Sequence, residues 1–234
     1  MSSTEIGMPV VPPKGYPQEV KDRLDQDADA VIARYPVSRS ALLPLLHLVQ
    51  SEEGYVSGDG IKYCADKLDL TTAEVSGVAT FYSMYKRRQV GDYHVGVCTN
   101  TLCAVLGGDE IFAALKQHLG VENDQRTEVS AQGRSLTLEH IECNAACDFA
   151  PVMMVNWEFF DNMTPEKAKQ LVDDLLAGRE VPASRGPAVC SFKDTERILA
   201  GFEDRRADAV TAGGSAGPES VVGLKIAQQR GEYA

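Results

Sequence analysis

Two pairs of cysteines constrain this chain more than any other feature of its sequence. Four residues separate Cys98 from Cys103, and three residues separate Cys143 from Cys147. Each pair can supply two thiolate ligands from one short loop, and thiolates of this kind select iron–sulfur clusters or zinc. Because the pairs are far apart in the sequence, the fold has to bring two loops together to make one metal centre.

Other uses of the four cysteines are less favoured by the pattern. Structural zinc is the serious alternative, since both spacings are near those of zinc ligands, but zinc modules usually close a short loop and this frame encloses helices and strands. Two disulfides would be unusual in a reducing compartment. A thioredoxin-type redox pair is not indicated, because neither pair has the C-x-x-C spacing. Of the remaining cysteines, Cys64 is expected to be a core residue and Cys190 an incidental thiol in the tail.

The sequence predicts a helical N-terminal half. Residues 1–16 contain three prolines and two glycines and are expected to form an extended arm. Residues 17–90 show helical spacing of apolar side chains, with Thr71 and Glu74 placed as a capping box. We expect a four-helix bundle here, with helices at about 17–34, 40–53, 58–68 and 72–82.

A change of period at Gly91 predicts a second domain over residues 91–180. Tyr93, Val95 and Val97 alternate with smaller or polar residues, as in a strand that ends at Cys98. Strands alternating with helices over about 90 residues are typical of a small α/β layer domain, so the fold class is α+β overall. Further strands are expected at 127–130, 135–142, 152–155 and 157–160, with helices at 108–119 and 164–177. Residues 181–234 are expected to be an extended, largely irregular tail with a short helix near 193–200.

Composition limits the function. The formal net charge of −11 argues against nucleic-acid binding and against an anionic membrane surface. No apolar run approaches the roughly 20 residues that a membrane span needs. The first residues show neither a basic start nor an apolar core of a signal peptide, so we expect a cytoplasmic protein with reduced cysteines.

Three sequence runs resemble a known family. VGVCTNTLC at 95–103, IECNAACDFAPVMMVN at 141–156 and ATFYSMY at 79–85 are similar to the small [2Fe–2S] subunit of respiratory complex I, the roughly 24-kDa E subunit of NADH–quinone oxidoreductase. The resemblance spans about Leu42 to Leu176 and fits both cysteine spacings. It implies a thioredoxin-like [2Fe–2S] ferredoxin domain after the helical bundle, with Cys98, Cys103, Cys143 and Cys147 as the cluster ligands.

The resemblance also implies a role. The chain would transfer single electrons between its [2Fe–2S] cluster and the FMN of a partner subunit that binds NADH, within an NADH–quinone oxidoreductase at the inner face of the cell membrane. No catalytic residue and no NADH, flavin or quinone site is expected in this chain. The same kind of subunit serves NAD-linked hydrogenases and formate dehydrogenases, so these remain alternatives, and a zinc-bound scaffold is a weaker one.

The residues around the cysteines predict the reduction potential of the site and the groups that approach its sulfurs. Neither loop contains Lys or Arg, and Asp148 follows Cys147, so we expect a low reduction potential of roughly −400 mV, as in plant-type ferredoxins. Small residues beside the ligands permit a close approach of the backbone to the sulfurs. The side-chain amides of Asn100 and Asn144 are further candidates for hydrogen-bond donors at the site.

Overall fold

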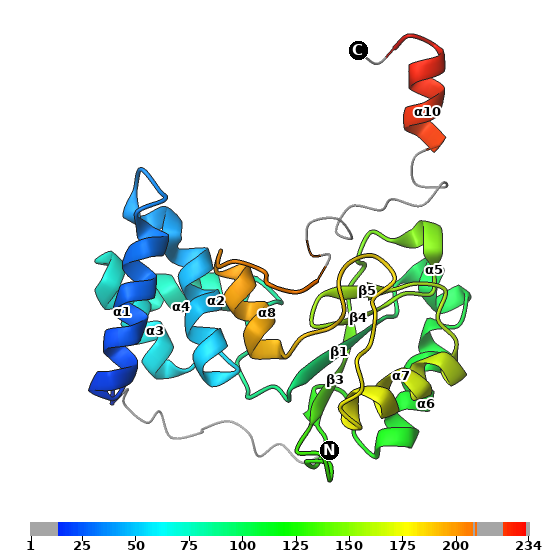
Figure 1. Cartoon of the computed structure of the whole chain (residues 1–234), viewed down its shortest axis with the longest axis horizontal. Helices are drawn as coiled ribbons and strands as arrows, with labels where there is room; N and C mark the ends of the chain where they lie inside the picture. Colours follow the sequence, from blue (N-terminus) through cyan, green and yellow to red (C-terminus); the bar gives the residue numbers. More distant parts are fainter. Residues whose placement is uncertain (1–13, 208, 210–221, 233–234) are drawn as a thin grey trace. The chain divides into compact units, whose positions relative to one another are not determined.

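A computed structural model describes residues 14–207, 209 and 222–232 of the chain (Figure 1). Most of the expected N-terminal arm and the Gly- and Ser-rich part of the tail lie outside these residues. The chain divides into two units, the first formed by Met1–Gln89 with Glu196–Phe202 and the second by Val90–Thr195 with Glu203–Ala234. Among the described helices, none has the length and apolar character required to cross a membrane.

The first unit is helical, as expected. Its elements are α1 (Gln18–Ile32), a 3-10 turn (Ser38–Ala41), α2 (Leu42–Glu53), α3 (Gly58–Leu68) and α4 (Thr72–Phe81). Six of the 12 residues of α2 and six of the 11 residues of α3 are buried, so these two helices supply much of the core of this unit. The predicted capping box of α4 is present, since Thr71 and Glu74 each accept a hydrogen bond from the backbone N–H of the other.

The tail contributes to this unit. The short helix expected near 193–200 is α8 (Phe192–Leu199), and its Glu196 is completely buried. Glu196 Oε2 lies 2.5 Å from His47 Nδ1 of α2, so the buried carboxylate has a charged or hydrogen-bonding partner. The first unit therefore contains a fifth helical segment from the far end of the sequence, in addition to the four that were expected.

The second unit is built on a five-stranded sheet with the order β2-β3-β1-β4-β5. Its strands are β1 (Tyr93–Cys98), β2 (Gln125–Arg126), β3 (Leu136–Ile141), β4 (Met153–Val155) and β5 (Glu158–Phe160). β1 and β3 run parallel, and the other neighbouring pairs are antiparallel. The prediction of a strand at 127–130 is wrong, because the residues that pair with β3 are Gln125 and Arg126.

Three helices belong to this sheet domain. α6 (Gly108–Leu119) is the crossover between the parallel strands β1 and β3, α7 (Pro165–Leu176) follows β5, and a short helix, α5 (Thr101–Val105), follows β1. α6 and α7 lie side by side (Figure 1) and bury Ile111, Leu115 and Val172 against one face of the sheet. Because side chains alternate along a strand, Val95 and Val97 face this core.

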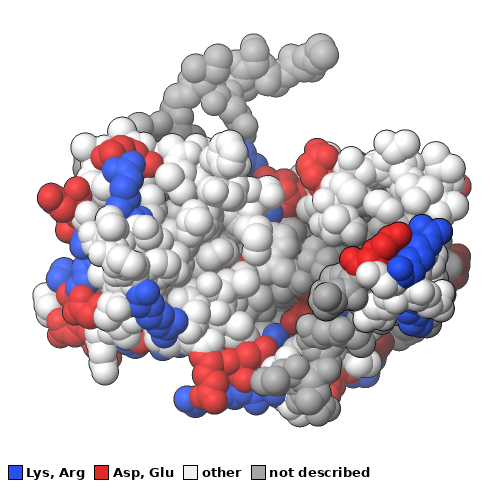
Figure 2. All heavy atoms as spheres, turned by 90° about the horizontal axis from the view of Figure 1, so that it is seen from above, with Lys and Arg blue, Asp and Glu red and all other residues white. Residues whose placement is uncertain are grey.

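The remaining described elements are a one-turn 3-10 helix (Cys147–Phe149) and α10 (Val222–Gln229). Charged side chains of both signs are interspersed on the face shown in Figure 2, with broad uncharged areas between them.

Candidate metal centre

The parallel register of β1 and β3 places the two cysteine loops next to each other. Cys98, the last residue of β1, is opposite Ile141, the last residue of β3, and Cys143 follows two residues later. The carboxyl ends of parallel strands lie at the same edge of a sheet, so both loops start from one edge. This neighbouring placement is what a site shared by the two loops requires.

Three contacts close the second loop on the first. The backbone N–H of Cys98 donates to the carbonyl of Val152 at 3.2 Å, so the segment from 142 to 152 leaves and returns beside Cys98. The Asn100 side-chain amide donates to Glu142 Oε2 at 2.9 Å. Ala146 is buried in one small cluster with Cys98, Cys103 and Val152, so residues of both loops pack together there.

The start of the α6 helix packs against the first cysteine loop. A Cβ atom on Gly108 would lie 2.5 Å from the carbonyl oxygen of Cys98 and 2.9 Å from that of Cys103, so only glycine fits at this point. Gly107, just before the helix, has a φ of +112°, a conformation that glycine adopts readily. The start of α6 is therefore held against the backbone of both first-loop cysteines.

The four thiols form two pairs of different exposure. Cys98 and Cys103 are buried, whereas Cys143 and Cys147 are exposed and their Sγ atoms are 3.9 Å apart. Burial raises the pKa of the Cys103 thiol to about 11, and the hydrogen bond with the Cys143 thiol raises the pKa of Cys147. All four are free cysteines, so none is committed to a disulfide.

The four thiols could serve either of the two metal centres that thiolates favour, zinc or an iron–sulfur cluster. Within the described ranges, no three His, Cys, Asp or Glu side chains gather around a point that could hold a single metal ion. Zinc takes all four ligands on one ion, whereas a two-iron cluster takes two thiolates on each iron. Two neighbouring thiol pairs, one of them with its Sγ atoms 3.9 Å apart, are a donor set that fits a [2Fe–2S] cluster.

Arg185 is a charged neighbour that the sequence did not reveal. Its guanidinium makes two 2.8 Å hydrogen bonds to Asp161 and lies 4.9 Å from the ring centres of both Phe149 and Phe159. It also comes within 3.8 Å of Asp148, the residue after Cys147. The negative charge expected beside the second loop is thus partly offset by an arginine 37 positions further along the sequence.

The remaining two cysteines are separate from this site. Cys64 is completely buried in the core of the first unit, as expected, and burial raises its pKa. Cys190 is half-buried with its Sγ 3.2 Å from Thr195 Oγ1. Neither residue belongs to the two cysteine loops.

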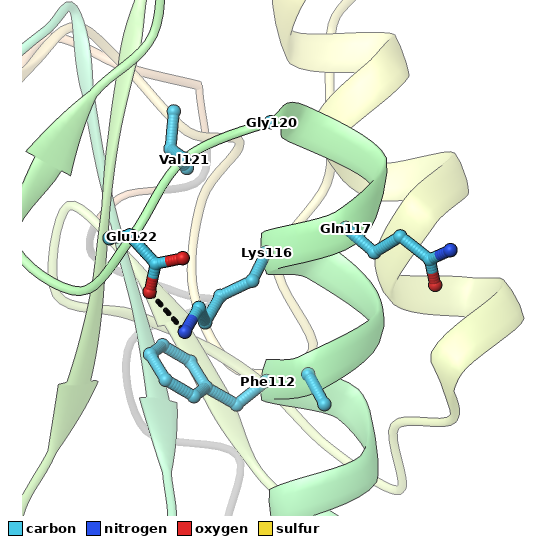
Figure 3. A pocket seen from close by; sticks show the side chains of 7 residues that line it. Phe112, Lys116, Gln117, Gly120, Val121 and Glu122 are labelled. Carbon is cyan, nitrogen blue, oxygen red and sulfur yellow. Dashed lines mark ion pairs between the residues drawn. The ribbon is translucent and has the colours of Figure 1, made fainter.

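A hollow of about 510 Å³ lies on the second unit, lined by residues of α6 and the segment after it (Figure 3). Phe112 and the ion pair between Lys116 and Glu122 line this hollow. Its lining includes the end of α6, whereas the cysteines contact the start of that helix, and none of the four cysteines lines it.

Comparisons with known proteins agree with this geometry. The family model described as thioredoxin-like [2Fe-2S] ferredoxin matches residues 28–176. The E subunit of the NADH-quinone oxidoreductase of Mycobacterium bovis is 55% identical over 217 residues, which cover 93% of this chain and 84% of the relative. The protein of the same name from Rickettsia felis is 38% identical over 150 residues, covering 63% of this chain and 87% of the relative.

Part of the fold also resembles a solved structure. The NAD+-reducing [NiFe]-hydrogenase in the air-oxidized state aligns with a TM-score of 0.50 and 19% identity over 58% of this chain and 23% of the hydrogenase chain. At this identity the likeness concerns the fold alone. The family match and the Mycobacterium and Rickettsia relatives show that the chain belongs to the thioredoxin-like [2Fe–2S] ferredoxin family, as a homologue of the E subunit of NADH-quinone oxidoreductase.

Proposed function

We propose that this chain is the [2Fe–2S] electron-transfer subunit of an NADH–quinone oxidoreductase, with Cys98, Cys103, Cys143 and Cys147 as its cluster ligands. The observation that carries the proposal is the parallel register of β1 and β3, which puts two pairs of free thiols at one sheet edge. The similarity to the Mycobacterium relative over most of both chains supports the choice of complex.

The protein's part in this function is to hold four thiolates and to keep two of them away from water. A [2Fe–2S] cluster supplies one-electron redox chemistry when bound. The buried Cys98 and Cys103 fix one side of the site away from water, and the backbone N–H of Ala145 lies 3.4 Å from Cys143 Sγ, where it lowers the cost of negative charge on that sulfur. Metal binding requires loss of the thiol protons.

The exposed side of the site suits contact with a partner. Cys143 and Cys147 are exposed, and the segment of α5 presents Leu102, Val105 and Leu106 with 44%, 78% and 52% of their surface accessible. Exposed apolar residues grouped on one short segment are typical of a protein–protein contact. We infer that this side meets a flavin-bearing, NADH-binding subunit, and that the assembled complex sits on the inner face of the cell membrane.

The EPR signal of the assembled complex after reduction with NADH tests the proposal. The complex is purified with the wild-type chain or its Cys143→Ser or Cys190→Ser variant, reduced with NADH under anaerobic conditions and frozen for EPR. We expect a [2Fe–2S] signal from this chain in the wild type and in Cys190→Ser, and an altered or absent signal in Cys143→Ser. An unchanged signal in Cys143→Ser would remove this residue from the ligand set.

The identity of the copurified subunits separates the alternatives. Quinone-reducing membrane subunits support the proposal, whereas hydrogenase or formate dehydrogenase subunits would assign the chain to one of those enzymes. Metal analysis of the same sample addresses the zinc scaffold, which would contain zinc and no labile sulfide.

A further inference from the structure

Asn144 lies between the two cysteines of the second loop, and the nitrogen of its side-chain amide is buried without a hydrogen-bond acceptor among the described residues. Its Nδ2 atom is shielded from solvent and has no hydrogen-bond partner among the described residues. An amide that leaves water without gaining a partner destabilises the fold, so such groups are rare in native proteins. The position of Asn144, directly after Cys143 and three residues before Cys147, indicates where its acceptor lies.

The loop conformation holds Asn144 in place. Ala145 has a φ of +54°, a left-handed conformation that is unusual for a residue with a side chain, and its N–H lies 3.4 Å from Cys143 Sγ. The next residue, Ala146, is packed against Cys98 and Cys103. The backbone on the C-terminal side of Asn144 is thus fixed by contacts to three of the four proposed ligands.

The chemistry of the amide fits the proposed site. Thiolates and sulfides accept hydrogen bonds and do not donate them, so they select the Nδ2 end of an asparagine side chain. Hydrogen bonds to the sulfurs are one of the factors that set the reduction potential of such clusters. We propose that Asn144 Nδ2 donates a hydrogen bond to a sulfur of the [2Fe–2S] centre and thereby raises its reduction potential; this inference rests on the proposed function.

The sign of the effect follows from charge. Reduction adds one negative charge to the site, and a donor hydrogen bond stabilises the more negative state more strongly. Replacement of Asn144 by leucine, which has a similar size and no donor, should therefore favour the oxidised state. We expect the ratio of reduced to oxidised cluster at a fixed ambient potential to fall about tenfold, which corresponds to about 59 mV for a one-electron couple.

Gln117 provides a matched control. It is exposed near the end of α6, whereas the cysteine carbonyls contact the start of that helix. Gln117→Leu therefore removes a side-chain amide of the same unit without changing the two cysteine loops, and the same ratio of reduced to oxidised cluster should stay within a factor of about two of the wild type.

The experiment uses the full-length chain, with iron and sulfide measured first. Redox-poised EPR gives the midpoints of the wild type, Asn144→Leu and Gln117→Leu, and pulsed EPR after exchange into deuterated water reports exchangeable protons near the cluster. A lowered midpoint with loss of one deuteron coupling in Asn144→Leu supports the proposal. An unchanged midpoint and unchanged couplings in that variant would overturn it.

A second readout does not need the cluster. In the metal-free chain the Nδ2 amide is buried without a partner, so Asn144→Leu should leave thermal stability equal or higher. A clearly lower melting temperature of the metal-free variant would indicate a structural partner and overturn the proposal. If Asn144→Leu takes up too little iron, Asn144→Ala replaces it in the EPR series. A wild-type chain without a [2Fe–2S] signal would instead refute the proposed function itself.

Discussion

Gly108→Ala should destabilise the second unit although alanine is the better helix former. In an unhindered helix this substitution stabilises by roughly 0.5–1 kcal/mol. At Gly108 the new Cβ would lie 2.5 Å from the carbonyl oxygen of Cys98 and 2.9 Å from that of Cys103, and these backbone atoms cannot rotate away. Overpacking of this kind costs about 1–3 kcal/mol, so the net loss should be about 1–2 kcal/mol.

The single tryptophan makes this measurement specific. Trp157 lies in the second unit with its ring centre 4.9 Å from that of His94, so its fluorescence reports unfolding of the unit that contains Gly108. Urea titration should give a lower midpoint for Gly108→Ala than for the wild type. Because α6 has to move away from both cysteine carbonyls, we also expect less bound iron.

Gly77→Ala is the matched control. Gly77 lies inside α4 in the first unit, and a Cβ there would meet no atom within 4 Å. This variant should be as stable as the wild type or more stable, by up to about 1 kcal/mol, with unchanged iron. If Gly108→Ala unfolded at the same urea concentration as the wild type and kept its iron, the close approach of α6 to the cysteine loop would contribute neither to stability nor to iron binding.

Three further predictions concern the surrounding structure. The hydrogen bond with Lys21 lowers the pKa of Asp25 to about 2, below the usual value for aspartate; its stabilising effect is therefore complete above about pH 4 and lost as the pH falls towards 2. Asp25→Asn should lower the free energy of unfolding at pH 7 by at most about 1 kcal/mol, with the difference shrinking below pH 4 in acid titrations; a constant difference would contradict the pairing. Thr71→Ala should cost about 1 kcal/mol by loss of the helix cap, measured by thermal unfolding, and no change would mean that the capping box contributes nothing. Arg185→Gln removes the guanidinium that pairs with Asp161 and should lower the midpoint potential in EPR titrations, and an equal or higher midpoint would show that its charge does not act on the site.

The helices were predictable because their information is local. Apolar spacing and the Thr71 capping box placed the first-unit helices close to their observed bounds. The five-residue helix α5 was missed, because one turn around Cys103 shows no measurable periodicity. The misplaced strand β2 has only two residues, too few for alternation to be recognised.

The site was predictable only in its residue types. The spacing of the cysteines indicated two loops, but their convergence depends on the register of β1 with β3, which pairs residues 43 positions apart. Asn100 and Asn144 were both candidate donors in the sequence, and only the fold distinguishes them, because one amide is used by Glu142 and the other is buried without a partner. Arg185 reaches the site from a distant segment, which sequence pattern does not reveal.

The central claim is that two cysteine pairs hold one two-iron centre. The most direct measurement is iron, labile sulfide and zinc content of the purified full-length chain, together with the number of EPR spins after anaerobic reduction. We expect about two irons, two sulfides and one unpaired electron per chain, because a reduced [2Fe–2S] cluster on four thiolates has this composition. Stoichiometric zinc without sulfide, or iron without an EPR signal in the reduced protein, would contradict it.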